Sequence, residues 1–118
     1  MKPKELETRL IKFSGLIIEL IQELQDNKAG NHLSGQLIRS STAPALIYGE
    51  AQSAESKKDF VHKMQLILKE LRETYIALKI VEVSSLCKCN SKMNCSLNEC
   101  NELISIFVVS VRNAKSRR

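Results

Sequence analysis

The chain has 118 residues, 43% hydrophobic and only 4% aromatic, with two prolines and four glycines, so we expect one domain over residues 1–118. Val, Ile and Thr do not alternate between turn signals, which argues against a sandwich or barrel. The longest apolar stretches, residues 16–18 and 106–109, are far shorter than the roughly 20 residues of a membrane span, and the charged N-terminal segment is unlike a secretory signal, so we expect a cytoplasmic location.

A first helix is predicted over about residues 4–25, with Pro3 in its opening turn and apolar residues at steps of three and four. Residues 26–31 end in Gly30 and Asn31 and predict a turn. A second helix is predicted over about residues 32–51. Because Pro44 lies inside it and lacks a backbone donor, we expect a kink or a break near residues 40–43.

The third helix is expected to start near Ser53 or Ser56, either of which suits an N-cap, and to end near residue 85. An almost unbroken apolar seam follows one of its faces and must be covered by other helices. The seam consists of Phe60, Met64, Ile67, Leu71, Thr74 and Leu78.

Residues 86–95 lack periodicity and predict the third connection. Ser96 and Glu99 then have the spacing of a capping box, which predicts a fourth helix from there to about residue 113. Four helices with short connections pack most naturally as antiparallel neighbours. The sequence therefore predicts an all-α, antiparallel, up-down-up-down four-helix bundle.

The net charge of +5 is concentrated in a basic C-terminal tail, residues 112–118, which contains no acid. Its basic residues are Arg112, Lys115, Arg117 and Arg118. Setting these aside leaves 14 of the 18 basic residues against 13 acidic ones, so the rest of the chain is nearly neutral. The tail either complements the negative end of the last helix dipole and frays into solvent, or contacts phosphates. Lys57, Lys58 and Lys63 on the third helix are the next candidates for a nucleic-acid contact.

Four cysteines, Cys87, Cys89, Cys95 and Cys100, fall within fourteen residues, separated by one, five and four positions. These spacings do not give the two paired knuckles of a usual zinc site. Three alternatives stay open: reduced thiols in a loop and helix start, a bound metal, or redox pairing.

Catalysis is not favoured by the residues present. His32 and His62 are the only histidines, with no nearby cysteine or carboxylate pair at ligand spacing. Ser40 and Ser41 precede Pro44 without the glycine elbow of a nucleophile. No phosphate-binding glycine loop occurs. We expect neither an enzyme nor a cofactor or metal.

Five charged residues of the second and third helices, Arg39, Glu50, Glu70, Arg72 and Glu73, are candidates for a shared structural role. The arginines Arg39 or Arg72 would pair with Glu50 or Glu70 and hold the two helices in register. A partner-binding surface is the alternative, because arginine recognises carboxylate and phosphate equally well through its forked geometry.

The chain resembles a bacterial four-helix-bundle family that includes proteins encoded in intervening sequences of 23S ribosomal RNA genes. The resemblance covers nearly the whole chain and is most specific at residues 36–39 (QLIR), 48–51 (YGEA), 58–60 (KDF) with Lys63, and 68–74 (LKELRET). The chain departs from the family where Ile47 and Tyr48 stand in place of a usual asparagine.

This resemblance implies a small, non-enzymatic protein similar to the accessory protein of diversity-generating retroelements. It implies a cyclic homo-oligomer, a pentamer, that binds RNA or DNA and a protein partner such as a reverse transcriptase, with no membrane role. A structural or protein-interaction scaffold is the alternative. The residues add an argument for assembly, because Ile17 with Ile18, and residues 106–109, place apolar surface on more than one helix face.

Overall fold

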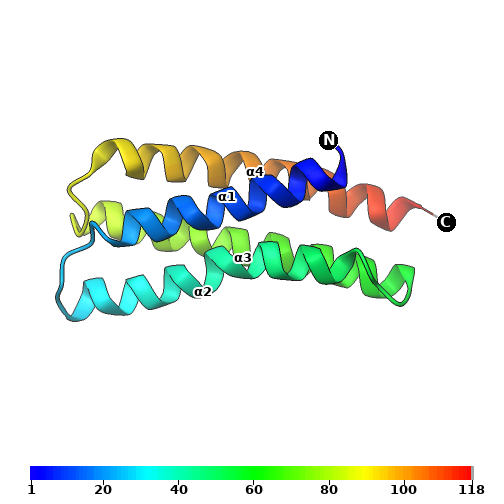
Figure 1. Ribbon diagram of the computed structural model, residues 1–118, viewed down its shortest axis with the longest axis horizontal. Coiled ribbons are helices and arrows are strands. Elements are labelled where there is room, and N and C mark those ends of the chain that lie inside the picture. The colour runs from blue at the N-terminus through cyan, green and yellow to red at the C-terminus, as the bar shows by residue number, and fades with distance from the viewer. Residues whose placement is uncertain (118) are drawn as a thin grey trace.

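The computed structural model describes residues 1–117 and contains four long α-helices. They are α1 (Pro3–Ile21), α2 (Lys28–Ala51), α3 (Lys57–Val83) and α4 (Asn90–Ser116). The molecule is elongated, with principal extents of 49 × 22 × 20 Å. Figure 1 shows the α1–α2 and α3–α4 connections at one end of the bundle, and both termini with the α2–α3 turn at the other.

The helices form the predicted antiparallel up-down-up-down bundle. Helix α1 lies beside α2 and α4, and α3 lies beside α2 and α4 on the opposite corner. The seam of α3 is buried from Met64 to Leu78, as its spacing predicted. Tyr48 of α2 reaches across the core to Phe107 of α4, with ring centroids 6.0 Å apart and the planes at 86°, an edge-to-face contact.

Helix α2 begins four residues before its predicted start. Asn27 is its N-cap and accepts a hydrogen bond from the amide of Gly30 at 2.8 Å. Gly30 is buried in the first turn, and a Cβ on it would overlap the carbonyl oxygen of Gln25. Gly30, which suggested a turn in the sequence, is therefore a helical residue. It lies where the helix comes too close to the carbonyl of Gln25 to leave room for a Cβ.

Pro44 does not break α2, which is helical throughout Lys28–Ala51. Proline removes the amide that would bond the carbonyl of Ser40. Buried residues on both sides, Leu37 and Tyr48, keep the same face of the helix against the core. Packing of that face outweighs the loss of one backbone hydrogen bond, so the expected break is absent.

The fourth helix also starts earlier than predicted, at Asn90 instead of Ser96. Ser96 is fully buried inside α4, and its hydroxyl donates to the carbonyl of Lys92 at 2.8 Å. Ser96 and Glu99 therefore do not form the expected capping box. The start of α3 agrees with the sequence, because Ser56 is its N-cap and accepts from the amide of Asp59 at 3.0 Å.

The two connections at one end of the bundle are joined to each other. The amide of Gln25 donates to the carbonyl of Leu86 at 2.9 Å, next to an isolated antiparallel bridge between Leu24 and Cys87. Ser85, just before this bridge, has a φ of 54° and reverses the chain after α3. None of the helices in residues 1–117 is long and apolar enough to cross a membrane.

Candidate functional site

A basic groove lies where the start of α3 meets the end of α4. Because α3 and α4 are antiparallel, Lys57 and Lys58 in the first turn of α3 come close to Lys115 in the last turn of α4. The groove has a volume of about 550 Å³. It is lined by Lys57, Lys58, Val61, His62, Gln65 and Lys115. Two sets of residues that the sequence offered as alternatives, the tail and the third-helix lysines, thus contribute to one surface.

The three lysines of this groove carry uncompensated charge. Within residues 1–117, Lys57, Lys58 and Lys115 take part in no ion pair, and all three are exposed. Lysine in the first turn of a helix also faces the positive end of the helix dipole, which is unfavourable by a few tenths of a kcal/mol. Lys57 and Lys58 therefore gain little from their own helix, and their charges are available to an anion.

Lys63 does not contribute to the groove. Its ammonium group lies 3.4 Å from Asp59 on the same helix. Asp59 also accepts from the amide of Glu55 at 3.2 Å, and this hydrogen bond, followed by the contact with Lys63, lowers the pKa of the Asp59 carboxyl. The charge of Lys63 is thus compensated by Asp59 in the first turn of α3.

The basic tail is divided between different surfaces. Helix α4 continues to Ser116, so Arg112 and Lys115 are helical residues. Arg112 is exposed but does not line the groove. Arg117 ends the helix and lies beside a separate hollow near Leu6 and Phe60. Arg118 falls outside the described residues. Lys115 is the residue of the tail that lines the groove.

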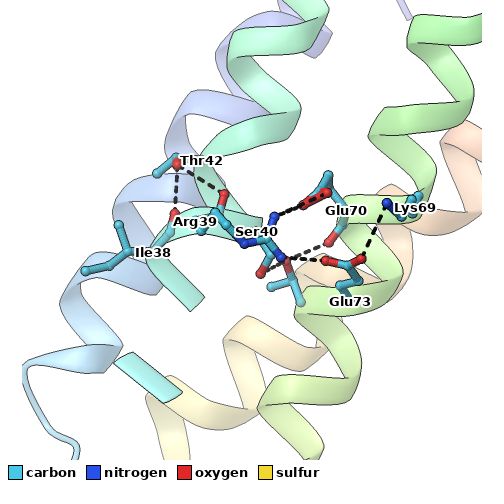
Figure 2. A network of polar contacts seen from close by, with 8 residues as sticks. Ile38, Arg39, Ser40, Thr42, Lys69, Glu70 and Glu73 are labelled. Carbon is cyan, nitrogen blue, oxygen red and sulfur yellow. Dashed lines mark hydrogen bonds and ion pairs between the residues drawn. The ribbon is translucent and has the colours of Figure 1, made fainter. Parts of the chain in front are cut away.

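A polar network joins the middle of α2 to the middle of α3, as Figure 2 shows. The guanidinium group of Arg39 donates to Glu70 at 2.8 Å and to Glu73 at 2.7 Å. Lys69 approaches Glu73 at 3.9 Å. Glu70 is 8% exposed, so its carboxylate depends on Arg39 for compensation. Both carboxylates raise the pKa of Arg39, the hydrogen bond to Glu73 most strongly.

Buried hydroxyls extend this network into the core. Ser40 and Thr74 are fully buried, and their hydroxyl oxygens are 2.9 Å apart. Thr74 also lies 2.9 Å from the carbonyl oxygen of Glu70 in the preceding turn. The hydroxyl of Ser41, equally buried, has no hydrogen-bond partner among residues 1–117. The network fixes the register of α2 against α3, and its hydroxyl groups are closed to solvent.

Two residues proposed for inter-helix pairing take no part in it. Within residues 1–117, neither Arg72 nor Glu50 forms an ion pair, and both side chains are exposed. A pair that the sequence did not suggest is present instead. Arg9 of α1 binds Glu99 at 2.8 Å and Glu102 at 3.0 Å on α4, about 90 residues away in the sequence.

The four cysteines are dispersed. All are free, and residues 1–117 contain no cluster of three or more groups able to hold a metal ion. Cys100 is fully buried and donates to the carbonyl of Leu71 at 3.3 Å; burial raises the pKa of its thiol to about 12. Cys89 precedes α4. The backbone amide of Lys92 approaches the Cys89 thiol without forming a regular capping hydrogen bond. This approach is the main cause that lowers the pKa of Cys89, and the contact with the Ser91 hydroxyl lowers it further.

Comparison of the sequence with known protein families, and with curated proteins, finds no match. The fold is similar to a crystal structure from Bacteroides thetaiotaomicron, described as a protein of unknown function from the S23 ribosomal protein family. The two share 23% identity with a TM-score of 0.84, over 95% of this chain and 99% of that one. At this identity the likeness establishes the fold.

Proposed function

We propose that this chain is a non-enzymatic, homo-oligomeric accessory protein of a family related to the S23 ribosomal proteins, and that it binds RNA through the basic groove. The observation that carries the proposal is the meeting of Lys57, Lys58 and Lys115 around one groove; these three lysines come from two helices and form no ion pair within residues 1–117. The amides at the start of α3 add partial positive charge at the same place. The negatively charged phosphodiester backbone of RNA matches this arrangement.

Recognition is directed to the backbone of the RNA. Readers of single-stranded sequence stack bases on exposed aromatic side chains. The five aromatic residues of this chain are buried or half-buried: Phe13, Tyr48, Phe60, Tyr75 and Phe107. Affinity for different RNA sequences should therefore be similar, and it should depend strongly on salt.

The experiment compares two triple variants with equal loss of charge. The first, Lys57→Gln, Lys58→Gln and Lys115→Gln, neutralises the groove. The control changes Lys12, Lys28 and Lys88 to Gln, because these lysines are exposed, lie outside the groove and form no ion pair within residues 1–117. RNA affinity is measured by fluorescence anisotropy over a range of salt concentrations.

For single-stranded RNA each lost phosphate contact reduces the log–log salt slope by about 0.7. The groove variant should lose about 2 in slope, and the control should keep the wild-type slope. Equal losses in the two variants would mean that binding depends on net charge alone. A protein that does not bind RNA at low salt would leave the second candidate, a protein-interaction scaffold, which is favoured by the exposed apolar side chains Ile76, Ile80 and Val83 on α3.

A further inference from the structure

A second hollow continues the basic groove along the exposed side of α3. Its volume is about 840 Å³, and Gln65 and Lys115 line both hollows. We call it the α3 trough and define it by Leu33, Leu68, Arg72, Ile76, Ala77 and Ile80. Because the two hollows share residues, a chain molecule bound in the groove can continue into the trough.

One stripe of α3 side chains connects the two hollows. Its members recur at steps of three and four, so they share one face of the helix, and all are exposed. The stripe consists of His62, Gln65, Lys69, Arg72, Ile76 and Ile80. At 1.5 Å per residue it is about 27 Å long. Its first part is polar and basic and its last part is apolar, so a ligand that follows it needs both anionic groups and apolar surface.

The charges of the trough favour an anion. Arg72 is exposed and forms no ion pair within residues 1–117. Lys69 is exposed too, and it approaches Glu73 only at 3.9 Å (Figure 2). Glu73 lines the trough as well, but Arg39 compensates it at 2.7 Å. Together with Lys115 at the end shared with the groove, these residues give the trough a net positive charge.

The other part of the trough is apolar. Ile76 is 59% exposed and Ile80 46%, and the half-buried Leu33 and Leu68 line the same hollow. Phosphate groups do not cover such a surface, whereas every unpaired nucleobase has an apolar face that does. In a duplex these faces are stacked on one another and are out of reach.

We propose that the basic groove and the α3 trough together bind single-stranded RNA, with phosphates at Lys115 and Arg72 and bases on Ile76 and Ile80. This inference rests on the proposed function and adds the class of RNA, single strands over duplexes. Contact with aliphatic side chains involves no base-specific hydrogen bond, so binding stays tolerant of sequence. Charge attraction alone predicts the opposite preference, because a duplex carries more phosphates per unit length than a single strand.

The first test compares three probes of equal length on the full chain. They are a single-stranded oligouridylate, a blunt RNA duplex, and a ribose-phosphate oligomer without bases. Fluorescence anisotropy over a range of salt concentrations gives the affinities, and we expect the oligouridylate to bind most tightly. A duplex or a baseless oligomer that binds as tightly as the oligouridylate would overturn the inference. If affinity still depended on the groove lysines, the proposed function would stand.

The second test removes the apolar part of the trough without a change of charge. The variant is Ile76→Asn with Ile80→Asn. Ile11→Asn with Ile38→Asn is the matched control, because these isoleucines are 55% and 45% exposed and lie outside both hollows. The trough variant should lose about tenfold in affinity for the single strand and keep its affinity for the duplex. Equal affinities of the two variants for the single strand would contradict a contact between bases and isoleucines.

The phosphate contact in the trough is tested by Arg72→Gln, which should lower the log–log salt slope for the single strand by about 0.7. An unchanged slope would exclude this contact. Circular dichroism and sedimentation velocity without RNA verify the fold and the oligomeric state of each variant. A folded trough variant with an altered oligomer size would assign the trough to a second copy of the chain and overturn the inference. A wild-type protein that binds no RNA at low salt would remove the proposed function and this inference together.

Discussion

Ser40 of α2 and Thr74 of α3 bring their hydroxyl oxygens to within 2.9 Å of each other in a part of the core that has no access to water. A buried hydroxyl that loses its partner costs about 1–3 kcal/mol, whereas removal of both partners is nearly neutral. We expect Thr74→Val to lower the free energy of unfolding by about 1–2 kcal/mol, and the double variant with Ser40→Ala to be less destabilised than the sum of the single changes.

Urea unfolding of the two single variants and the double variant measures this coupling. Ser41→Ala is the matched control, because its hydroxyl is buried without a partner within residues 1–117 and its loss should not destabilise the protein. Strict additivity of Ser40→Ala and Thr74→Val would show that the two hydroxyls do not stabilise each other.

Arg39 is expected to stabilise the bundle through Glu70. Arg39→Ala would leave the Glu70 carboxylate, 8% exposed, without its partner at 2.8 Å, and should reduce the free energy of unfolding. Lys69→Ala removes only a 3.9 Å contact of an exposed ammonium group and should cost less than about 0.5 kcal/mol. Thermal unfolding compares the two. Similar effects of both changes would contradict a dependence on the burial of Glu70.

Two helical glycines should respond to alanine in opposite directions. Gly30→Ala places a methyl group against the carbonyl oxygen of Gln25 and is expected to destabilise the protein. Gly35→Ala meets no atom within 4 Å, and alanine in a helix interior is better than glycine by about 0.5–1 kcal/mol, so this change should be stabilising. Chemical unfolding of both variants is the measurement. A destabilising Gly35→Ala would point to an unrecognised contact at that face.

Cys100 should make the protein sensitive to alkaline pH. Its thiol ionises near pH 9 when unfolded, whereas burial raises the folded pKa to about 12. Above pH 9 the unfolded chain binds fewer protons than the folded one, so stability falls as pH rises, and the contribution is complete below pH 9 and lost towards pH 12. One pKa unit corresponds to about 1.4 kcal/mol, which gives a loss of about 2–3 kcal/mol by pH 11.

Unfolding curves between pH 8 and pH 11 for the wild type and Cys100→Ala isolate this effect, because tyrosine and lysine titrate in both. The variant will have a different stability at neutral pH, so the comparison concerns the slope with pH. Parallel pH profiles would mean that the thiol ionises equally easily in the folded and unfolded chain.

The third helix was predictable because its seam repeats without interruption and Ser56 marks its start. The starts of α2 and α4 were not, because in both places a small residue that normally signals a boundary is buried inside a helix: Gly30 against Gln25, and Ser96 in the core. Helix and turn propensities describe the isolated chain, whereas at the starts of α2 and α4 tertiary packing decides the conformation.

Residues of the candidate site were visible in the sequence as separate basic groups, but their grouping was not. Lys115 joins Lys57 and Lys58 only through the antiparallel packing of α3 and α4, more than 50 residues apart in sequence. Lys63 differs from them because it forms an ion pair with Asp59, one helical turn earlier, which compensates its charge. The pairing of Arg9 with Glu99 likewise depends on a register between α1 and α4 that no local pattern encodes.

The position of the two chain ends decides how this protein should be labelled. Both lie at the end of the bundle that holds the α2–α3 turn, where the basic groove also lies, so an acidic tag on either terminus would come near the groove lysines. The α3–α4 connection is at the opposite end of a molecule 49 Å long (Figure 1). Cys89 lies at that connection, and its lowered pKa favours the reactive thiolate, so a maleimide dye on it would stay away from the groove once the exposed Cys95 is replaced.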